Sequence, residues 1–329
     1  MKPNFAAKLL LLTSILIFIS ITVYLSRKKH SRLPILKPSS GYYPPAYYNI
    51  EPPPESDQFS EGLGEKCVPS NINITLLTPE EKLEYDTVSK NVTLNVFLSD
   101  RISVRRYIED KRDPQCIRSF TEPLPETSVI MVFHNEVYSL LLRSLHSVID
   151  RSSPNLLREI ILVDDASDYD YMNGRLQKYL ELLDKVKLVR LKERGGLVKA
   201  RLAGIEEATG ETLTFLDSHI ECLPGWLEPL LEQVKMNPKR IAEPDINGIS
   251  GYTFEIGFTN PPYIGTFDWS LDFFWSPFES NKSDPYGLVR IPALTGGIFT
   301  INSEYFKSLG YWDKELQFYA YENMDLNFK

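Results

Sequence analysis

Residues 128–133 read SVIMVF, the first of four short apolar runs that decide the fold. The other three are 159–163 (EIILV), 186–191 (VKLVRL) and 212–216 (TLTFL). Each run is rich in β-branched residues and is only five or six residues long, which is typical of a β-strand. The segments between them, 140–149, 176–183 and 197–208, carry apolar residues at helical spacing. This alternation predicts βαβ units and an α/β fold with a mostly parallel, Rossmann-like sheet.

Polar residues follow three of the predicted strands directly. In parallel sheets of this kind, ligands bind at the carboxyl ends of the strands. Those ends carry His134-Asn135-Glu136, Asp164-Asp165 and Asp217-Ser218-His219. No G-x-G-x-x-G follows the first strand and no G-x-x-x-x-G-K-[ST] occurs anywhere, which argues against a classical NAD site and a P-loop.

Two of these polar groups suggest specific chemistry. An Asp at the position of Asp165 commonly binds a ribose hydroxyl or a uracil edge, although it could equally cap the next helix. In an extended segment, Asp217 and His219 point the same way and could share one metal ion. Mixed oxygen and nitrogen ligands suit Mn2+ or a similar ion that bridges a diphosphate. A D-x-H triplet can also arise by chance, but this one follows a buried strand directly.

Composition narrows the class of protein. The 329 residues include 36 Lys and Arg against 44 Asp and Glu, a net charge of −8, and 43% are hydrophobic. This is ordinary for a globular protein, and the acidic balance argues against a nucleic-acid partner. The three cysteines (Cys67, Cys116 and Cys222) form no C-x-x-C pair, so neither a zinc knuckle nor a disulfide scaffold is expected.

The N-terminal part predicts a membrane anchor. Residues 9–25 are seventeen uncharged, mainly apolar residues, the short end of the transmembrane range. A cleaved signal peptide is the alternative, but no A-x-A-like cleavage site follows the run. The expected order is a cytosolic tail at 1–8, the anchor at 9–25, and a stem or linker at 26–112. This stem is Pro-rich from 34 to about 65, and residues 76–112 become charged and partly helical as a transition into the folded domain. Near the end of this stem, Thr78 marks a plausible helix start.

The orientation of the anchor is ambiguous from these residues alone. More Lys and Arg follow the apolar run than precede it, which would place the C-terminal side in the cytosol. Three Asn-x-Ser/Thr sequons, at Asn73, Asn91 and Asn281, could be used only in the lumen.

Six blocks in order resemble a known family. Examples are 125–149 (PETSVIMVFHNEVYSLLLRSLHSVI), 158–168 (REIILVDDASD), 213–222 (LTFLDSHIEC) and 292–306 (PALTGGIFTINSEYF). They are similar to the catalytic domain of polypeptide N-acetylgalactosaminyltransferases. The resemblance implies a GT-A glycosyltransferase domain at 113–329. It also implies Mn2+-dependent, retaining transfer of N-acetylgalactosamine from UDP-N-acetylgalactosamine to Ser or Thr of acceptor proteins. The family's location favours a single-pass type II protein of the Golgi membrane with a lumenal catalytic domain, which agrees with the sequons.

The resemblance also implies roles for individual residues. The positions that match donor-binding residues are Phe133, His134, Glu136, Asp165, Arg194, Gly196, Gly296 and Gly297. Asp217 and His219 match the metal-binding D-x-H. Glu322 matches a catalytic-site acid that contacts the sugar.

The chain departs from the family pattern near its end. Residues 319–323 read YAYEN where the family has W-G-G-E-N, so Ala and Tyr replace two glycines. The family's third metal ligand is a later His, and none of the four histidines follows Glu322. The partner of Cys116 and a lectin domain are likewise expected beyond residue 329. Two alternatives therefore stay open: a catalytically impaired relative that binds a UDP-sugar or a glycoprotein partner, and a GT-A transferase that uses another UDP-sugar.

Several other residues are expected to be structural. His146 lies among apolar residues of a predicted helix and is expected to pack in the core. Cys222 is expected to be a buried thiol rather than a ligand. Trp226, Trp269 and Trp275 are expected in the core rather than at an acceptor site.

Overall fold

The computed structural model describes residues 51–89, 94–117, 119–120, 123–257, 263–278, 288–316 and 321–329. The predicted anchor at 9–25 and the sequons Asn91 and Asn281 lie outside these residues. Within the described part, no helix is long and apolar enough to cross a membrane.

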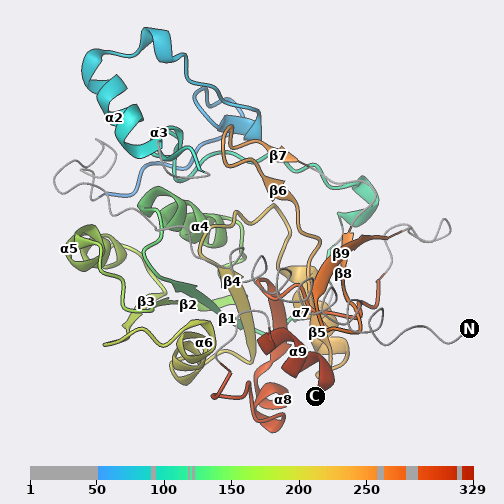
Figure 1. Ribbon diagram of the computed structural model, residues 1–329. Coiled ribbons are helices and arrows are strands. Elements are labelled where there is room, and N and C mark those ends of the chain that lie inside the picture. The colour runs from blue at the N-terminus through green and yellow to red at the C-terminus, as the bar shows by residue number, and fades with distance from the viewer. Residues whose placement is uncertain are drawn as a thin grey trace, which may run out of the picture.

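A six-stranded sheet forms the centre of the molecule, in the order β3-β2-β1-β4-β10-β5 (Figure 1). The four predicted strands are confirmed and run parallel to one another, whereas β10 is antiparallel to β4 and β5. The strands are β1 (Thr127–Phe133), β2 (Leu157–Asp164), β3 (Val186–Arg190), β4 (Thr212–Asp217), β5 (Ile241–Ala242) and β10 (Phe299–Asn302). The predicted α/β fold is therefore correct.

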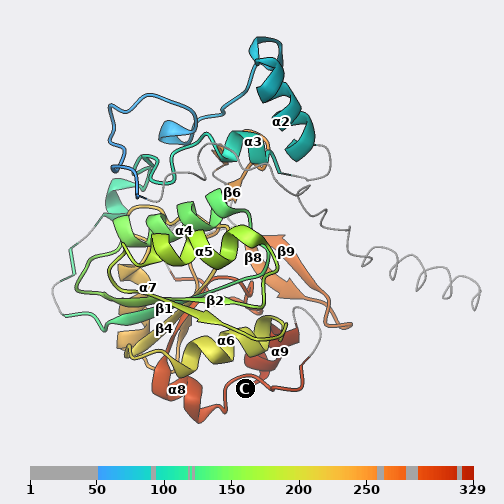
Figure 2. The same cartoon turned by 90° about the vertical axis from the view of Figure 1, so that its left-hand side faces the viewer.

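Helices cover both faces of this sheet (Figure 2). Helices α4 (Tyr138–Asp150) and α5 (Asp170–Leu180) lie on one face, and α6 (Leu197–Glu206) and α8 (Ser303–Ser308) lie on the other. Strand β1 shows the underlying pattern: Met131 packs with the α4 side, and its neighbour Ile130 packs with the α6 side. Because both faces are buried, β1 and the second half of β2 are near-continuous apolar runs instead of alternating with polar residues.

The C-terminal half adds elements around β10. Helix α7 (Glu228–Met236) packs against β5 and β10, and α9 (Tyr321–Phe328) lies below the sheet in Figure 2. Two hairpins complete this part: β6 (Gly248–Ile249) with β7 (Ile256–Gly257), and β8 (Tyr263–Phe267) with β9 (Phe273–Pro277). Trp312 closes the core on the α6 face, because its ring makes edge contacts with Phe215, Phe299 and Phe306.

Residues 51–116 form an N-terminal segment that lies over α4 (Figures 1 and 2). Its helices are α2 (Pro79–Ser89) and α3 (Val96–Ser99), with short 3-10 turns at Glu65–Cys67, Ile74–Leu76 and Pro114–Cys116. The helix start expected at Thr78 is confirmed. The Thr78 backbone N–H donates to Glu81, and the Glu81 backbone N–H donates to the Thr78 hydroxyl, which makes a capping box.

The later part of this segment lies within the stem or linker expected at 26–112, where residues 76–112 are expected to form a transition into the folded domain. Leu98 and Ile102 are buried and pack with Phe254. Arg106 is also buried, and its guanidinium makes a two-point ion pair with Glu221, just beyond β4. Apolar burial and a desolvated ion pair thus hold these residues on the sheet domain. These contacts join residues far apart in the sequence. Local composition does not encode them, so the sequence predicted a linker here.

The residues expected to be structural have mixed outcomes. His146 is buried as predicted and bonds the Tyr179 hydroxyl at 2.7 Å; burial lowers its pKa to about 4. Cys222 is a buried thiol as predicted, and burial raises its pKa to about 12. Trp226 is partly buried against the core. The core assignment is wrong for the other two tryptophans, since Trp269 is fully exposed and Trp275 is 46% exposed on the β8–β9 hairpin.

Candidate active site

The predicted site residues gather where β1, β2 and β4 end. The sheet places these ends side by side, because β1 pairs with β2 on one side and with β4 on the other. Helix α6 and the loop before β10 complete the surroundings. Residues more than 150 positions apart in sequence are thereby brought together, as expected for a doubly wound sheet.

Asp165, at the end of β2, binds the loop that leads into α6. One carboxylate oxygen accepts from the Gly195 backbone N–H at 2.6 Å, and the other accepts from the Gly196 N–H at 3.0 Å. Arg194 adds an ion pair at 3.9 Å. Gly196 has φ = 82°, a conformation that a side chain would strain. Three of the predicted donor-binding residues, Asp165, Arg194 and Gly196, are thus in contact.

The end of β1 adds a second set of contacts. The His134 ring bonds the Asp165 backbone carbonyl through Nδ1 at 2.8 Å. Asn135 adopts φ = 52° and exchanges hydrogen bonds with Asp168. Phe133 differs from the expected donor contact, because its side chain is only 2% exposed and packs in the core on the α4 face.

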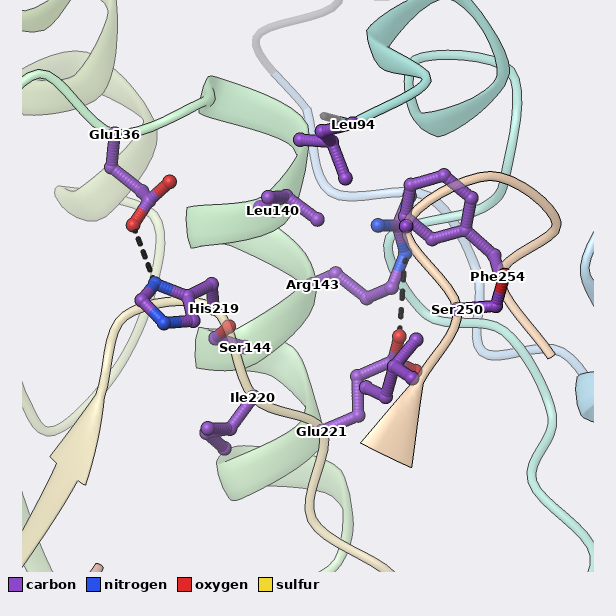
Figure 3. A pocket seen from close by; sticks show the side chains of 12 residues that line it. Leu94, Glu136, Leu140, Arg143, Ser144, His219, Ile220, Glu221, Ser250 and Phe254 are labelled. Atoms are coloured by element: carbon purple, nitrogen blue, oxygen red, sulfur yellow. Dashed lines mark hydrogen bonds and ion pairs between the residues drawn. The ribbon is translucent and has the colours of Figure 1, made fainter. Parts of the chain in front are cut away.

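Glu136 bridges β1 and the loop after β4. Its Oε2 accepts from the Ser218 hydroxyl at 2.7 Å and lies 2.9 Å from Nδ1 of His219 (Figure 3). Burial by itself would raise the pKa of Glu136, but His219 and Ser218 together lower it below its usual value. The same hydrogen bond raises the pKa of His219 against the opposing effect of burial. The sequence assigned Glu136 to the donor, whereas the structure places it on the predicted metal ligand.

Asp217 sits at the end of β4 with its side chain 40% exposed. Gly297 leaves space for it: a Cβ added at Gly297 would lie 2.3 Å from Oδ2 of Asp217. A side chain at this position would therefore displace the Asp217 carboxylate, since no real Cβ tolerates that distance.

Gly296 and Glu322 meet through a residue that the sequence reading did not single out. The Arg201 guanidinium donates to the Gly296 carbonyl at 2.8 Å and lies 3.8 Å from a Glu322 oxygen. Gly296 has φ = 89° and packs directly on Asn323. The sequence feature that could have singled out Arg201 is a charged residue between two apolar ones. Ala200 and Leu202, its neighbours on α6, are both buried.

A second missed residue holds the loop before β10. Glu243 accepts from the backbone N–H of Thr295 at 2.9 Å and from its hydroxyl at 2.5 Å. Burial raises the pKa of Glu243, although the Thr295 hydrogen bonds oppose this rise.

A pocket of about 300 Å³ opens beside the Glu136–His219 pair (Figure 3). Leu140, Ile220 and Phe254 supply apolar walls, and Arg143 and Glu221 supply charge at the far end. A partly apolar pocket therefore lies next to the Glu136–His219 pair, on the side of α4.

The metal-binding potential of the site rests on two side chains. Within the described ranges, no group of three or more His, Cys, Asp or Glu residues is arranged to hold a metal ion. Asp217 and His219 could nevertheless supply two of the ligands of a metal ion. A carboxylate that bonds the second ring nitrogen of a metal-binding histidine is the usual outer-sphere arrangement, and Glu136 supplies it here.

Comparisons with known proteins agree with this geometry. The family model for "Glycosyl transferase family 2" matches residues 128–310. "Polypeptide N-acetylgalactosaminyltransferase 5" of Caenorhabditis elegans is 42% identical over 266 residues, covering 78% of this chain and 42% of the relative. "Polypeptide N-acetylgalactosaminyltransferase 3" of Mus musculus is 42% identical over 305 residues, covering 88% and 47%. The chain spans less than half the length of these curated relatives.

A solved structure gives the same result. The "Crystal structure of GalNAc-T7 with UDP, GalNAc and Mn2+" superposes with a TM-score of 0.74 at 33% identity, covering 84% of this chain and 52% of that one. The GT-A type fold expected from the sequence is thereby confirmed. Fold, strand-end site and relatives agree: the chain belongs to glycosyl transferase family 2, and its resemblance to the polypeptide N-acetylgalactosaminyltransferases is confirmed.

Proposed function

We propose that this protein transfers N-acetylgalactosamine from UDP-N-acetylgalactosamine to Ser or Thr hydroxyls of proteins, with retention of configuration. The observation that carries the proposal is the placement of Asp217 and the Glu136-held His219 two residues apart at the end of β4, where Asp217 packs on Gly297. Relatives with the polypeptide N-acetylgalactosaminyltransferase name support the same activity.

The nucleotide would bind at the ends of β1 and β2. His134 and Asp165 are already joined there, and Asp165 fixes the backbone of Gly195 and Gly196. These contacts hold the strand ends and the loop into α6 in one arrangement, which would lower the entropic cost of association. Arg194, half-exposed beside Asp165, would face the donor.

The sugar and diphosphate would lie between β4 and α9. Asp217 and Nε2 of His219 would hold Mn2+, which would offset the negative charge on the departing UDP. Glu136 keeps the His219 ring oriented, and the lack of a side chain at Gly297 keeps the Asp217 carboxylate in place. Glu322 would contact the sugar from the buried side, where Arg201 balances its charge.

For the cellular location, we propose a type II Golgi membrane protein anchored by residues 9–25, with the catalytic part in the lumen. The uncharged apolar run supports the anchor. Asn73 supports the lumenal side, because this sequon residue is exposed at the start of a short 3-10 turn and is open to glycosylation. A mobility shift on glycosidase treatment that is smaller in Asn73→Gln would support the orientation; an unmodified Asn73 in secretory-pathway membranes would argue against it.

The activity test uses the purified full chain with UDP-N-acetylgalactosamine, Mn2+ and a Ser/Thr/Pro-rich peptide. Mass spectrometry would follow both the glycosylated peptide and released UDP, with and without a chelator. Transfer should exceed donor hydrolysis, require the metal, and be lost in Asp217→Asn. Asp184→Asn is the matched control, because Asp184 is exposed in the turn before β3, away from the strand ends of the site.

The same experiment separates the competing functions. UDP binding without transfer would identify a non-catalytic relative. A donor panel would reveal a transferase for another UDP-sugar, because peptide would then be modified only by that donor. Either result would overturn the proposed activity.

A further inference from the structure

Arg201 is a buried charge at the centre of the site. It projects from α6 and is only 3% exposed. Its guanidinium lies 5.7 Å from the centre of the Phe215 ring and 5.5 Å from that of Trp312. A buried guanidinium is costly unless charges and hydrogen bonds compensate it, so the partners of Arg201 indicate why it is there.

Those partners come from three separate parts of the chain. Nη2 donates to the Gly296 carbonyl at 2.8 Å and lies 4.0 Å from a carboxylate oxygen of Asp217. Nη1 lies 3.8 Å from Glu322, which is itself 2% exposed. One side chain therefore links the end of β4, the loop before β10 and helix α9.

The two ion-pair distances are longer than a hydrogen bond, whereas the contact to Gly296 is a good one. Arg201 thus fixes the orientation of the Gly296 carbonyl through a hydrogen bond, and it attracts the carboxylates of Asp217 and Glu322 electrostatically. Gly296 has little freedom to move the other way, because a Cβ there would already collide with the Asn323 amide. The loop is clamped between Arg201 and α9.

We propose that Arg201 is a positioning residue that sets where the donor's sugar sits relative to its diphosphate. This rests on the proposed function, in which Asp217 serves the diphosphate side while Gly296 and Glu322 serve the sugar side. The fixed fork of the guanidinium spans both sides. Reacting groups held to within a fraction of an ångström are needed for fast transfer, and misplacement by about 1 Å can cost on the order of 100-fold in rate.

The test compares Arg201→Gln and Arg201→Lys with the unmodified full chain. Dissociation constants for UDP and for UDP-N-acetylgalactosamine are measured by calorimetry with Mn2+ present, together with kcat for peptide glycosylation and thermal unfolding. Arg158→Gln is the control, since Arg158 is about half exposed at the start of β2 and its partners, Glu126 at 3.6 Å and the Thr209 hydroxyl at 3.3 Å, are not among the site residues. Arg201→Lys keeps the charge, so it remains informative where Arg201→Gln folds poorly.

Arg201→Gln should reduce kcat about 100-fold and weaken binding of the sugar nucleotide at least tenfold more than binding of UDP. Arg201→Lys should restore part of the sugar-nucleotide affinity, because it retains the charge but not the fork. Equal loss of affinity for both ligands, or no loss for either, would overturn the role of Arg201. Failure of the unmodified chain to bind the sugar nucleotide would instead overturn the proposed function.

Discussion

Removing the Glu136 carboxylate should weaken metal binding without unfolding the protein. Glu136 reaches His219 at 2.9 Å and Ser218 at 2.7 Å, so it fixes the ring that would bind Mn2+. Loss of such an outer-sphere partner typically costs 10–100-fold in metal affinity, or about 1.4–2.7 kcal/mol. Glu136→Gln keeps an acceptor oxygen, so its loss of metal affinity should be near 10-fold. Glu136→Ala removes the acceptor, so its loss of metal affinity should be near 100-fold.

The assay is titration of Mn2+ into the full chain with UDP present, with free Mn2+ followed by electron paramagnetic resonance. Glu181→Gln, which changes an exposed carboxylate at the end of α5, is the control.

The pH dependence of Mn2+ binding gives a second readout. Because Glu136 raises the pKa of His219, protons compete with the metal for this ring from a higher pH. In Glu136→Ala the dissociation constant for Mn2+ should be larger, but the pH at which it begins to rise on acidification should be lower. Unchanged affinity and an unchanged profile in Glu136→Ala would refute the reasoning.

Three further predictions concern packing and buried charge. Gly297→Ala should abolish most transfer while leaving thermal unfolding nearly unchanged, because the new Cβ displaces Asp217; Gly174→Ala, where a Cβ meets nothing within 4 Å, should retain activity. Glu159→Gln should cost up to about 3 kcal/mol of unfolding free energy at pH 7. Burial raises the pKa of Glu159, but hydrogen bonds, chiefly from Lys187, outweigh burial and lower this pKa to about 2. The stabilisation is therefore complete above the unfolded value of about 4.5 and disappears as the pH falls towards 2, and urea unfolding at several pH values would reveal a flatter profile in the variant. Trp312→Ala should cost about 3–5 kcal/mol in the same assay, since its ring is 1% exposed among three phenylalanines; a loss below 1 kcal/mol would contradict that packing.

The parallel part of the fold could be predicted because burial on both faces leaves a local signature. Strands β1 to β4 are short apolar runs separated by helical spacing, and each lies within a few residues of its expected bounds. Strands β5 and β10 have two and four residues, too few for a periodicity to register. Their place in the sheet depends on antiparallel pairing with distant residues, which local patterns do not encode.

The candidate site was predictable in its parts but not in its connections. Asp165, Asp217 and His219 follow strands directly, so their position at one edge of the sheet could be expected. The pairing of Glu136 with His219 spans 83 residues and requires β1 and β4 to be neighbours. The role of Arg201 likewise depends on residues brought to α6 from nearly 100 positions away. Strand order, rather than residue type, decides both contacts.

The packing of the N-terminal segment changes how far the domain could reach from a membrane. With an anchor at 9–25 and a free stem to residue 112, the tether would be 87 residues long, or about 300 Å fully extended. The structure ties residues 94–108 to the sheet domain through Leu98, Ile102 and the Arg106–Glu221 pair. At most residues 26–93 then remain as tether, about 240 Å. The turn at Glu65–Cys67 is also held by this arginine, through the Gly64 carbonyl. Arg105 bonds the Pro53 carbonyl and the Ser56 backbone N–H, which leaves 26–52, or about 95 Å. With the proposed anchor and activity, acceptor hydroxyls farther from the bilayer than the tether and the domain together can reach would not be glycosylated. The length of the tether would then restrict acceptors by their distance from the membrane as well as by their sequence.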